Sequence, residues 1–223
     1  MIKKLFLDLT KGSCKYSGYF DVYEKHLNKF VGKSPKILEI GIFDGGSLEL
    51  WEKYFGDSSK IFGVDIHPDV LNQKHGPNTK ILLGNQGDSN FWDNFLKEET
   101  GFDIIIDDGS HIMRDQILTL EKLFPHLNDG GVYICEDTHT SYWDGWQSQN
   151  SETFLNYSKK ITDVVNQQHY RGKTPVSKSE LDIYSNLYSV SYYNSVVVFE
   201  KRHNLVFEPI DTKNKVNLHL LSL

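Results

Sequence analysis

The sequence predicts an α/β fold in which a doubly wound, mostly parallel sheet carries helices on both faces. Short apolar segments alternate five times with segments whose apolar residues recur at helical spacing. Residues 104–106 are three consecutive isoleucines, and such an unbroken β-branched run is typical of a strand that helices cover on both faces. Two further strands, near 187–192 and 195–201, flank Tyr193 and Asn194, which fits a hairpin. In an open sheet of this kind, ligands bind at the carboxyl ends of the strands.

Each predicted element follows from its own pattern. Residues 1–18 are rich in Lys, Gly and Ser, so we expect a loosely structured lead-in, followed by a helix from Tyr19; this 1–35 segment would cover the site. The main domain is expected over 36–202, with a C-terminal extension over 203–223. Its five parallel strands are expected at 36–40, 60–64, 80–83, 104–106 and 132–135, with a turn at 128–131 before the fifth. After the fifth strand we expect a substrate-facing loop at 140–150, a helix within 151–170 and a polar loop at 171–180.

Composition excludes several classes of protein. A chain of 223 residues with 39% hydrophobic residues can bury one α/β core, and its net charge of −6 offers no basic surface for nucleic acid or an anionic membrane. Two cysteines, one in an expected strand, do not indicate a disulfide framework. The first ten residues hold too short an apolar run for a signal peptide or membrane span. We therefore expect a cytoplasmic enzyme.

A glycine-rich turn follows the first expected strand. It reads Glu39-Ile-Gly41-Ile-Phe-Asp44-Gly45-Gly46-Ser47 and leads into a helix, a unit in which the backbone can approach a nucleotide because glycine has no Cβ. The alternative is a glycine-rich loop that only makes a tight turn and binds no ligand. The spacing of the glycines departs from GxGxxG, which disfavours a nicotinamide cofactor. Asp65 follows the second strand at the position where an acid binds a ribose diol, and Gln86, Gly87 and Asp88 follow the third. Together these residues predict adenosine binding.

Four carboxylates follow the fourth and fifth expected strands. Asp107 and Asp108 end one strand, and Glu136 and Asp137 end the next. If the strands are neighbours, these charges converge and a cation would offset their repulsion, although a solvated, hydrogen-bonded strand edge is the simpler alternative. An all-oxygen cluster suits Mg²⁺ or Ca²⁺ better than zinc. We expect Asp108, Glu136 and Asp137 to be the ligands and Asp107 to lie behind them or nearer the cofactor.

His111 is the preferred candidate for a general base. It lies three residues after Asp108 at the start of a helix, so it can face the same cavity. An imidazole is the side chain best suited to accept a hydroxyl proton near pH 7. A role in capping the helix or bonding a carboxylate is the alternative. His139 is the second candidate base, and a structural role is more expected for it.

Five motifs between residues 15 and 202 can be compared with known families: LEIGIFDGGSLELW, GVDIHP, FDIIIDDGSHI, LFPHLNDGGVYICEDTHTSYW and YYNSVVVFEK. With them the chain resembles the class I S-adenosylmethionine (SAM)-dependent methyltransferases. The resemblance is to the metal-dependent sugar O-methyltransferases of macrolide tailoring, of the mycinamicin and macrocin type, and to the cephalosporin-cluster methyltransferase. DDGSH paired with EDTHTSYW is specific to these enzymes, whereas the glycine motif indicates only the superfamily.

The resemblance implies a Rossmann-like sheet of seven strands with an antiparallel last strand. It also implies Mg²⁺ held by Asp108, Glu136 and Asp137, with His111 as base and SAM as methyl donor. A homo-oligomer is expected. Family members with an added N-terminal domain use it in assembly and in closing the site; such a domain is not expected in this chain, so the form of the oligomer and the size of the acceptor stay open. In the expected site, Glu39 and Gly41 line the methionine end of the cofactor, Asp65 holds its ribose, and Gln86 and Asp88 lie near the adenine. Further expected cofactor-binding residues are Gly45, Ser47, Gly87 and Asp107, and the residues expected to face the acceptor are His139, Tyr142 and Trp143.

The expected reaction is methyl transfer to a sugar hydroxyl of a glycoside, a nucleotide sugar or a surface polysaccharide. Catechol-like diols also fit the chemistry, and the sequence does not identify the acceptor. An NAD(P)-dependent oxidoreductase on the same fold is the alternative enzyme class, and retention on adenosylhomocysteine rather than a dinucleotide would distinguish them. A SAM-binding module without catalysis is a third possibility. Nucleic-acid methylation is disfavoured because a base-flipping Asn/Asp-Pro-Pro-aromatic motif is absent and the net charge has the wrong sign.

Overall fold

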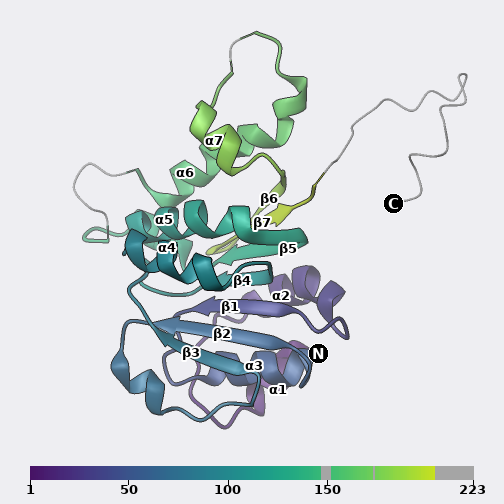
Figure 1. The fold of residues 1–223 in the computed structure, drawn as a ribbon, viewed down its shortest axis with the longest axis vertical. Helices are drawn as coiled ribbons and strands as arrows, with labels where there is room; N and C mark the ends of the chain where they lie inside the picture. Colours follow the sequence, from purple (N-terminus) through teal and green to yellow (C-terminus); the bar gives the residue numbers. More distant parts are fainter. Residues whose placement is uncertain (147–151, 173, 204–223) are drawn as a thin grey trace, which may run out of the picture.

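The computed structural model describes residues 1–146, 152–172 and 174–203 (Figure 1). Its strands form one sheet of seven, in the order β3-β2-β1-β4-β5-β7-β6. Strands β1 to β5 are parallel, and β7 runs antiparallel to both β5 and β6. The predicted sheet with an antiparallel last strand is therefore confirmed. The strands are β1 Lys36–Ile40, β2 Lys60–Asp65, β3 Thr79–Leu83, β4 Phe102–Asp107, β5 Leu127–Cys135, β6 Leu187–Tyr193 and β7 Val196–Lys201.

Helices cover both faces of the sheet (Figure 1). One hydrophobic core packs α1 to α3 against one face, and a second packs α4 to α7 against the other. The α-helices are α1 Ile2–Leu7, α2 Tyr19–Leu27, α3 Gly46–Phe55, α4 Ser89–Glu98, α5 Met113–Leu123, α6 Phe154–Ile161 and α7 Lys178–Ile183; the 3₁₀ turns are η1 Asn28–Phe30, η2 Pro68–Asn72, η3 Phe124–His126, η4 Thr138–Tyr142 and η5 Thr162–His169. Within the described ranges, no helix has the length and apolar character needed to cross a membrane.

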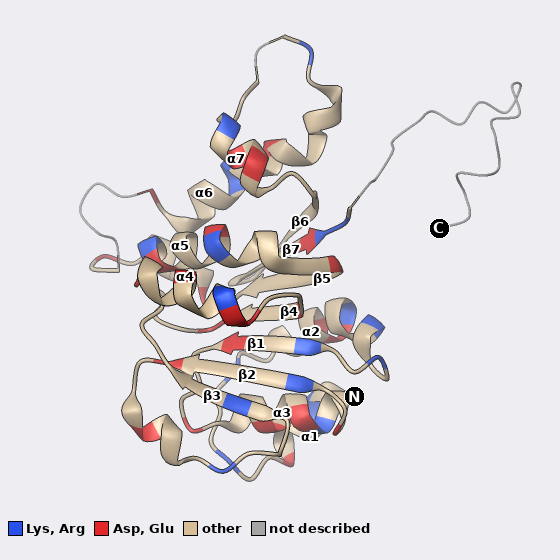
Figure 2. Cartoon of the chain, viewed as in Figure 1, with Lys and Arg blue, Asp and Glu red and all other residues tan. Residues whose placement is uncertain are grey.

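The strand order places a ligand site beside β1. The chain leaves β1 toward β2 and later returns to its other side as β4, so the loops after β1 and β4 diverge at the carboxyl edge and leave a crevice. Figure 2 shows lysines near the amino ends of β1 to β3, namely Lys36, Lys60 and Lys80. Acidic residues lie toward the opposite ends. The predicted site residues therefore share one edge of the sheet.

Strand alternation decides where the acids point. In β4, Ile105 faces the core of α4 and α5, and Asp107 continues on that face, where Tyr133 of β5 binds it. In β5, Ile134 faces the core of α1 to α3, and Glu136 continues toward α2, where the hydroxyl of Tyr23 binds it. Two carboxylates at neighbouring strand ends therefore lie on opposite sides of the sheet.

Three sequence expectations differ from the structure. The lead-in is not loose throughout: α1 forms at its start because Ile2 is buried against the neighbouring helices. Strand β5 includes 128–131, expected as a turn, and α7 begins inside the expected 171–180 loop, where Ser177 and Glu180 form a capping box. Residues 147–150 of the expected loop and 204–223 of the expected extension lie outside the described residues.

Candidate active site

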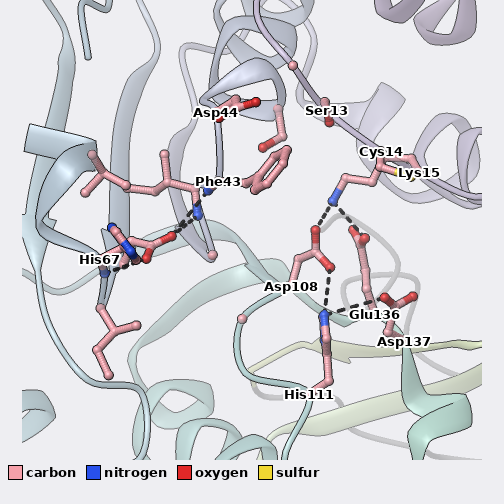
Figure 3. A pocket seen from close by; sticks show the side chains of 18 of the residues that line it. Ser13, Cys14, Lys15, Phe43, Asp44, His67, Asp108, His111, Glu136 and Asp137 are labelled. Atoms are coloured by element: carbon pink, nitrogen blue, oxygen red, sulfur yellow. Dashed lines mark hydrogen bonds and ion pairs between the residues drawn. The ribbon is translucent and has the colours of Figure 1, made fainter. Parts of the chain in front are cut away.

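A cavity of about 760 Å³ lies at the carboxyl edge of the sheet (Figure 3). This volume is in the range of small-molecule and cofactor sites. Its walls come from the lead-in, the loops after β1 and β2, and the acidic strand ends, which the sequence had predicted to converge. The lining residues are Gly12, Ser13, Cys14, Lys15, Tyr16, Tyr19, Gly41, Ile42, Phe43, Asp44, Ser47, Asp65, Ile66, His67, Asp69, Val70, Gln73, Asp108, Gly109, His111, Glu136 and Asp137.

Gly41 permits close approach of the loops after β1 and β4. Its φ is +91°, and a Cβ at this position would lie 2.0 Å from the carbonyl oxygen of Asp108. A larger residue is therefore excluded by both conformation and space. Phe43 follows with a side chain 70% exposed, at the cavity wall. The glycine turn thus brings backbone to the cavity, as predicted for a nucleotide site.

Asp65 organises the opposite part of this wall. Its Oδ2 accepts hydrogen bonds from the backbone N–H groups of Ile42, at 2.7 Å, and Phe43, at 3.3 Å. Its Oδ1 accepts from the N–H of His67 at 2.8 Å. The carboxylate lines the cavity and joins the loops after β1 and β2, so it is fixed in the place where the sequence predicted a ribose ligand.

Three other residues of the glycine turn have different positions. Ser47 lines the cavity, whereas Glu39 and Gly45 do not. Glu39 is fully buried, and its Oε2 accepts from Trp51 Nε1 at 2.9 Å; Oε1 has no hydrogen-bond partner among the described residues. Burial raises the pKa of Glu39 to about 7, against the opposing charge of Lys15. Gly45 caps α3 with φ +83°.

The other residues predicted to bind the cofactor lie outside the cavity lining. Gln86 Nε2 donates to Asp107 Oδ1 at 2.6 Å, and Tyr133 donates to Oδ2 of the same carboxylate at 2.8 Å. Burial raises the pKa of Asp107 to about 7, and these two hydrogen bonds oppose the rise. Asp88 caps α4, and none of Gln86, Gly87, Asp88 and Asp107 is in the cavity lining. Gln86 reaches the segment next to the lining, because its Oε1 accepts a hydrogen bond from the N–H of Ser110 at 2.7 Å.

Asp108, His111 and Asp137 form a compact cluster in the cavity. One potential ligand atom from each lies within 4.8 Å of the others. His111 Nε2 is 3.5 Å from Asp137 Oδ2 and 4.0 Å from Asp108 Oδ1 (Figure 3). His111 and Asp137 both have left-handed backbones, with φ of 55° and 52°. Such conformations are costly for these residues and gather at functional sites.

Glu136 is held apart from this cluster by Lys15 of the lead-in. Lys15 Nζ lies 2.8 Å from Glu136 Oε2 and 2.5 Å from Asp108 Oδ2 (Figure 3). Burial raises the pKa of Glu136 to about 8, while Lys15 opposes the rise. Burial would also lower the pKa of Lys15, but Asp108 and Glu136 outweigh it and raise that pKa well above its ordinary value. The Tyr23 hydroxyl donates to the other oxygen of Glu136.

The chemistry of this donor set fits a hard divalent cation. Asp108, Glu136 and Asp137 offer carboxylate oxygens, which Mg²⁺ prefers, and His111 offers one nitrogen. The buried ammonium of Lys15 between Asp108 and Glu136 shows that this gap favours positive charge. Of the three predicted metal ligands, Asp108 and Asp137 lie in one cluster with His111, whereas Glu136 is bridged to Asp108 by Lys15.

Two of the three residues predicted for the acceptor, His139 and Trp143, belong to an aromatic group beside the cavity lining. His139 Nδ1 lies 2.5 Å from Ser195 Oγ, and its ring centroid is 4.5 Å from that of Trp143. Trp146 continues the series, 6.1 Å from Trp143 and 6.2 Å from His111. Tyr142 is 76% exposed. Trp143 is thus connected to the cluster through aromatic rings.

Sequence reasoning missed three site residues in the lead-in and α2. Lys15, Tyr19 and Tyr23 are spaced four residues apart, and their polar ends all reach the acidic strand ends. Tyr19 and Tyr23 had been interpreted only as part of a helix face. For Tyr19 and Tyr23, the spacing of four on one helix face, together with an excess of carboxylates, is the signal that could have identified them. Lys15 precedes the helix, so its spacing carries no such signal.

The chain was compared with known proteins. No protein-family model matches the sequence. It is 31% identical over 82% of its length to mycinamicin VI 2''-O-methyltransferase of Micromonospora griseorubida, and 32% identical over 81% to L-olivosyl-oleandolide 3-O-methyltransferase of Streptomyces antibioticus. The matches cover 47% and 48% of those proteins. The chain thus spans about half the length of these relatives.

A solved structure shares the fold. The MycE methyltransferase of the mycinamycin biosynthetic pathway, in complex with Mg, SAH and mycinamycin VI, superposes with a TM-score of 0.77 and 26% identity. The match covers 95% of this chain and 57% of MycE. With the sheet order and the sequence relationship, it shows that this chain belongs to the class I SAM-dependent methyltransferases and is related to the sugar O-methyltransferases of macrolide and tetracenomycin biosynthesis.

Proposed function

We propose that this chain transfers the methyl group of SAM to a sugar hydroxyl with the help of a divalent metal ion, Mg²⁺ by preference. The observation that carries the proposal is a single cavity that joins the Gly41 and Asp65 wall to the cluster of Asp108, His111 and Asp137. Relatives named as sugar O-methyltransferases and MycE, solved with Mg and SAH, support the same chemistry.

The cofactor half of the cavity would bind SAM. Asp65 would accept hydrogen bonds from the ribose hydroxyls, since its carboxylate is held at the wall by three backbone N–H groups. Gly41 and Ser47 would lie beside the methionine part, with buried Glu39 beneath them. When bound, SAM supplies an electrophilic methyl group on a sulfonium. These residues orient it toward the acidic end of the cavity.

At that end, His111 would take the proton of the acceptor hydroxyl at Nε2. Asp137, 3.5 Å away, would stabilise the resulting imidazolium. A bound metal supplies a Lewis acid that lowers the pKa of the hydroxyl. If Nε2 is the base, it is not a ligand, which leaves Asp108, Glu136 and Asp137 to hold the ion. The acceptor would be a glycoside, a nucleotide sugar or a polysaccharide, and a homo-oligomer stays a prediction.

Calorimetry tests the proposal. Chelator-treated protein is titrated first with adenosylhomocysteine and then with Mg²⁺, for the wild type, Asp108→Ala and the control Asp69→Ala, which removes an exposed acid at the cavity wall. We expect cofactor binding in all three proteins and loss of the Mg²⁺ response in Asp108→Ala alone. Absence of adenosylhomocysteine binding in the wild type would contradict the proposal.

The base is tested separately. His111→Ala should bind adenosylhomocysteine normally while turnover of an acceptor found by screening sugar glycosides falls by ~10² to 10⁴. Its Mg²⁺ affinity, measured in the same samples, shows whether the imidazole is also a ligand. Turnover at the wild-type rate would exclude His111 as the base.

A further inference from the structure

We propose that Lys15 is a tethered cation that occupies the Glu136 side of the metal site and must leave when a divalent ion binds there. Metal binding would then release part of the lead-in. The inference rests on the proposed function in taking Mg²⁺ as the ion, but it concerns a residue that the proposed reaction does not use. It makes Lys15 the residue that sets the metal affinity of the site.

The position of the ammonium is the first argument. Lys15 Nζ bridges Asp108 Oδ2 and Glu136 Oε2 at 2.5 and 2.8 Å, and its side chain is only 2% exposed. Both carboxylates belong to the expected ligand set, and Mg²⁺ holds such oxygens at about 2.0–2.1 Å. An ion bound by Asp108 and Glu136 would therefore take the place of the ammonium. Two cations in this one buried gap would repel each other.

The need for charge compensation is the second argument. Glu136 is fully buried, and Asp108 lies across the gap from it. Without a cation, two like charges would face each other in a site with little water. Lys15 supplies one positive charge and Mg²⁺ would supply two. The ammonium thus keeps the metal-free protein folded around its acidic residues until an ion replaces it.

The lead-in is anchored on both sides of Lys15. The N–H groups of Thr10 and Lys11 donate to the carboxylate of Glu49, at 3.1 and 3.0 Å, and Gly46 N donates to the carbonyl of Gly12 at 3.0 Å. On the other side, α2 begins at Tyr19. Residues 13–18 lie between these anchors, so they are the part that can move without breaking the anchoring contacts.

Release of Lys15 would also change the cofactor cavity. Residues 12–16 all line it, together with Gly41 and Asp65 on the facing wall. A segment that moves when the metal enters therefore alters the space in which the cofactor lies. Metal and cofactor binding should therefore be coupled, because the lead-in makes different contacts in its metal-free and metal-bound positions.

The competition has a measurable sign. Where a binding-competent state is only partly populated, the apparent affinity is reduced by its population. Removing the ammonium should therefore tighten Mg²⁺ binding, although most changes beside a metal site weaken it. In the alternative, Lys15 only completes the fold and the ion is bound by Asp108, His111 and Asp137. Replacing Lys15 would then not tighten Mg²⁺ binding.

The experiment uses the full chain after chelator treatment. Mg²⁺ is titrated by calorimetry into the wild type, Lys15→Met and Lys15→Gln, the second variant retaining a polar side chain should the first not fold. We expect the dissociation constant for Mg²⁺ to fall ~10-fold or more in the variants. We also expect a lower metal-free melting temperature and a larger increase on adding Mg²⁺ than in the wild type.

Lys11→Met is the matched control. Lys11 lies in the same segment, but its Nζ contacts the carbonyl of Lys74 and the ring of His75, away from the acidic cluster. Its replacement should leave the Mg²⁺ dissociation constant within about twofold of the wild type, since such surface contacts contribute little. Tightening in Lys11→Met as well would mean that a loosened segment, not the lost ammonium, causes the effect, and would overturn the proposal.

The reactivity of the Lys15 amine supplies a second readout. Its modification by an acylating reagent should become faster when Mg²⁺ is added to the wild type, because the side chain is only 2% exposed in the metal-free structure. Unchanged or weaker Mg²⁺ affinity in the Lys15 variants, unchanged reactivity of Lys15 in the wild type, or no Mg²⁺ binding to any of the proteins would each overturn the proposal. Adenosylhomocysteine binding, measured in the same samples, reports separately on the proposed methyltransferase function.

Discussion

The hydroxyl of Tyr19 lies 2.5 Å from Oδ1 of Asp137 and 2.9 Å from Oγ of Ser195. The backbone N–H of Asp137 donates to the same hydroxyl at 3.3 Å. Asp137 has a left-handed backbone with φ of 52°, so these contacts hold a carboxylate in a conformation that the residue seldom adopts. Tyr19 therefore fixes the direction of an expected metal ligand from outside the sheet.

Tyr19→Phe should weaken Mg²⁺ binding by ~10-fold or more, because loss of a group that orients a ligand typically costs this much. The expected change is opposite in sign to that of Lys15→Met, although both residues come from the same part of the chain. Titration of chelator-treated protein measures it. Tyr54→Phe is the control, since this phenol on α3 has no contact with the acidic cluster. Equal Mg²⁺ affinity in Tyr19→Phe and the wild type would refute the prediction.

The sheet could be predicted from the sequence because local patterns decide its strands. The predicted strand 36–40 has the same bounds as β1, and the isoleucines of β4 are buried as their β-branched run indicated. Helix α1 was missed since it has only six residues, and its stability depends on burying Ile2 against elements distant in sequence. Tertiary packing of this kind leaves no periodic signal.

The convergence of the acidic residues was also predictable, because parallel strands end at the same edge. Their separate directions were not: Asp107 turned away toward Gln86, and Glu136 turned toward Tyr23. The direction of each side chain depends on which face of the sheet the residue occupies. This face can be assigned only when the ends of the strands are known. Lys15 was unpredictable for a different reason, since it contacts Glu136 across 121 positions of sequence.

Asp65→Asn should reduce affinity for adenosylhomocysteine by ~10- to 100-fold. The substitution replaces one acceptor oxygen by an amide that faces backbone N–H donors, and hydrogen bonds to charged groups contribute ~1.5–3 kcal/mol. Calorimetry checks the affinity and thermal unfolding checks the fold. Asp69→Asn, which also changes an acid at the cavity wall, should leave affinity within about twofold. A similar loss in both variants would argue against a specific ribose contact.

Stability in acid should depend on Glu200 of β7, whose carboxylate contacts His26 of α2. The hydrogen bond from His26, with the charge of Lys29, lowers the pKa of Glu200 to about 2 from an ordinary 4.5. Because the folded pKa is depressed, the stabilisation is present above pH 4.5 and is lost as pH falls toward 2. Since the group is partly exposed, we expect ~1 kcal/mol.

Denaturant unfolding from pH 2 to pH 6 measures this contribution. Glu200→Gln should be less stable than the wild type at pH 6, and the two should converge near pH 2. Glu98→Gln, at an exposed position on α4, should follow the wild type throughout. A constant difference between Glu200→Gln and the wild type at all pH values would show that packing, rather than charge, is responsible.

Trp143 and Tyr142 were predicted together as a platform for the acceptor sugar, and the structure gives a reason to separate them. The ring of Trp143 packs edge-on against His139 and is held near Trp146, which reaches His111, whereas Tyr142 is 76% exposed. A ring fixed by its neighbours costs less entropy to use in binding than a free one.

Trp143→Ala should therefore raise KM for the acceptor about fivefold with kcat nearly unchanged, because the ring contributes ~1 kcal/mol of binding that is equal in the ground and transition states. Tyr142→Ala should change KM by less than about twofold. Adenosylhomocysteine affinity should be unchanged in both, since neither residue lines the cavity. A larger increase of KM in Tyr142→Ala would place the acceptor on the exposed ring and away from the series that leads to His111.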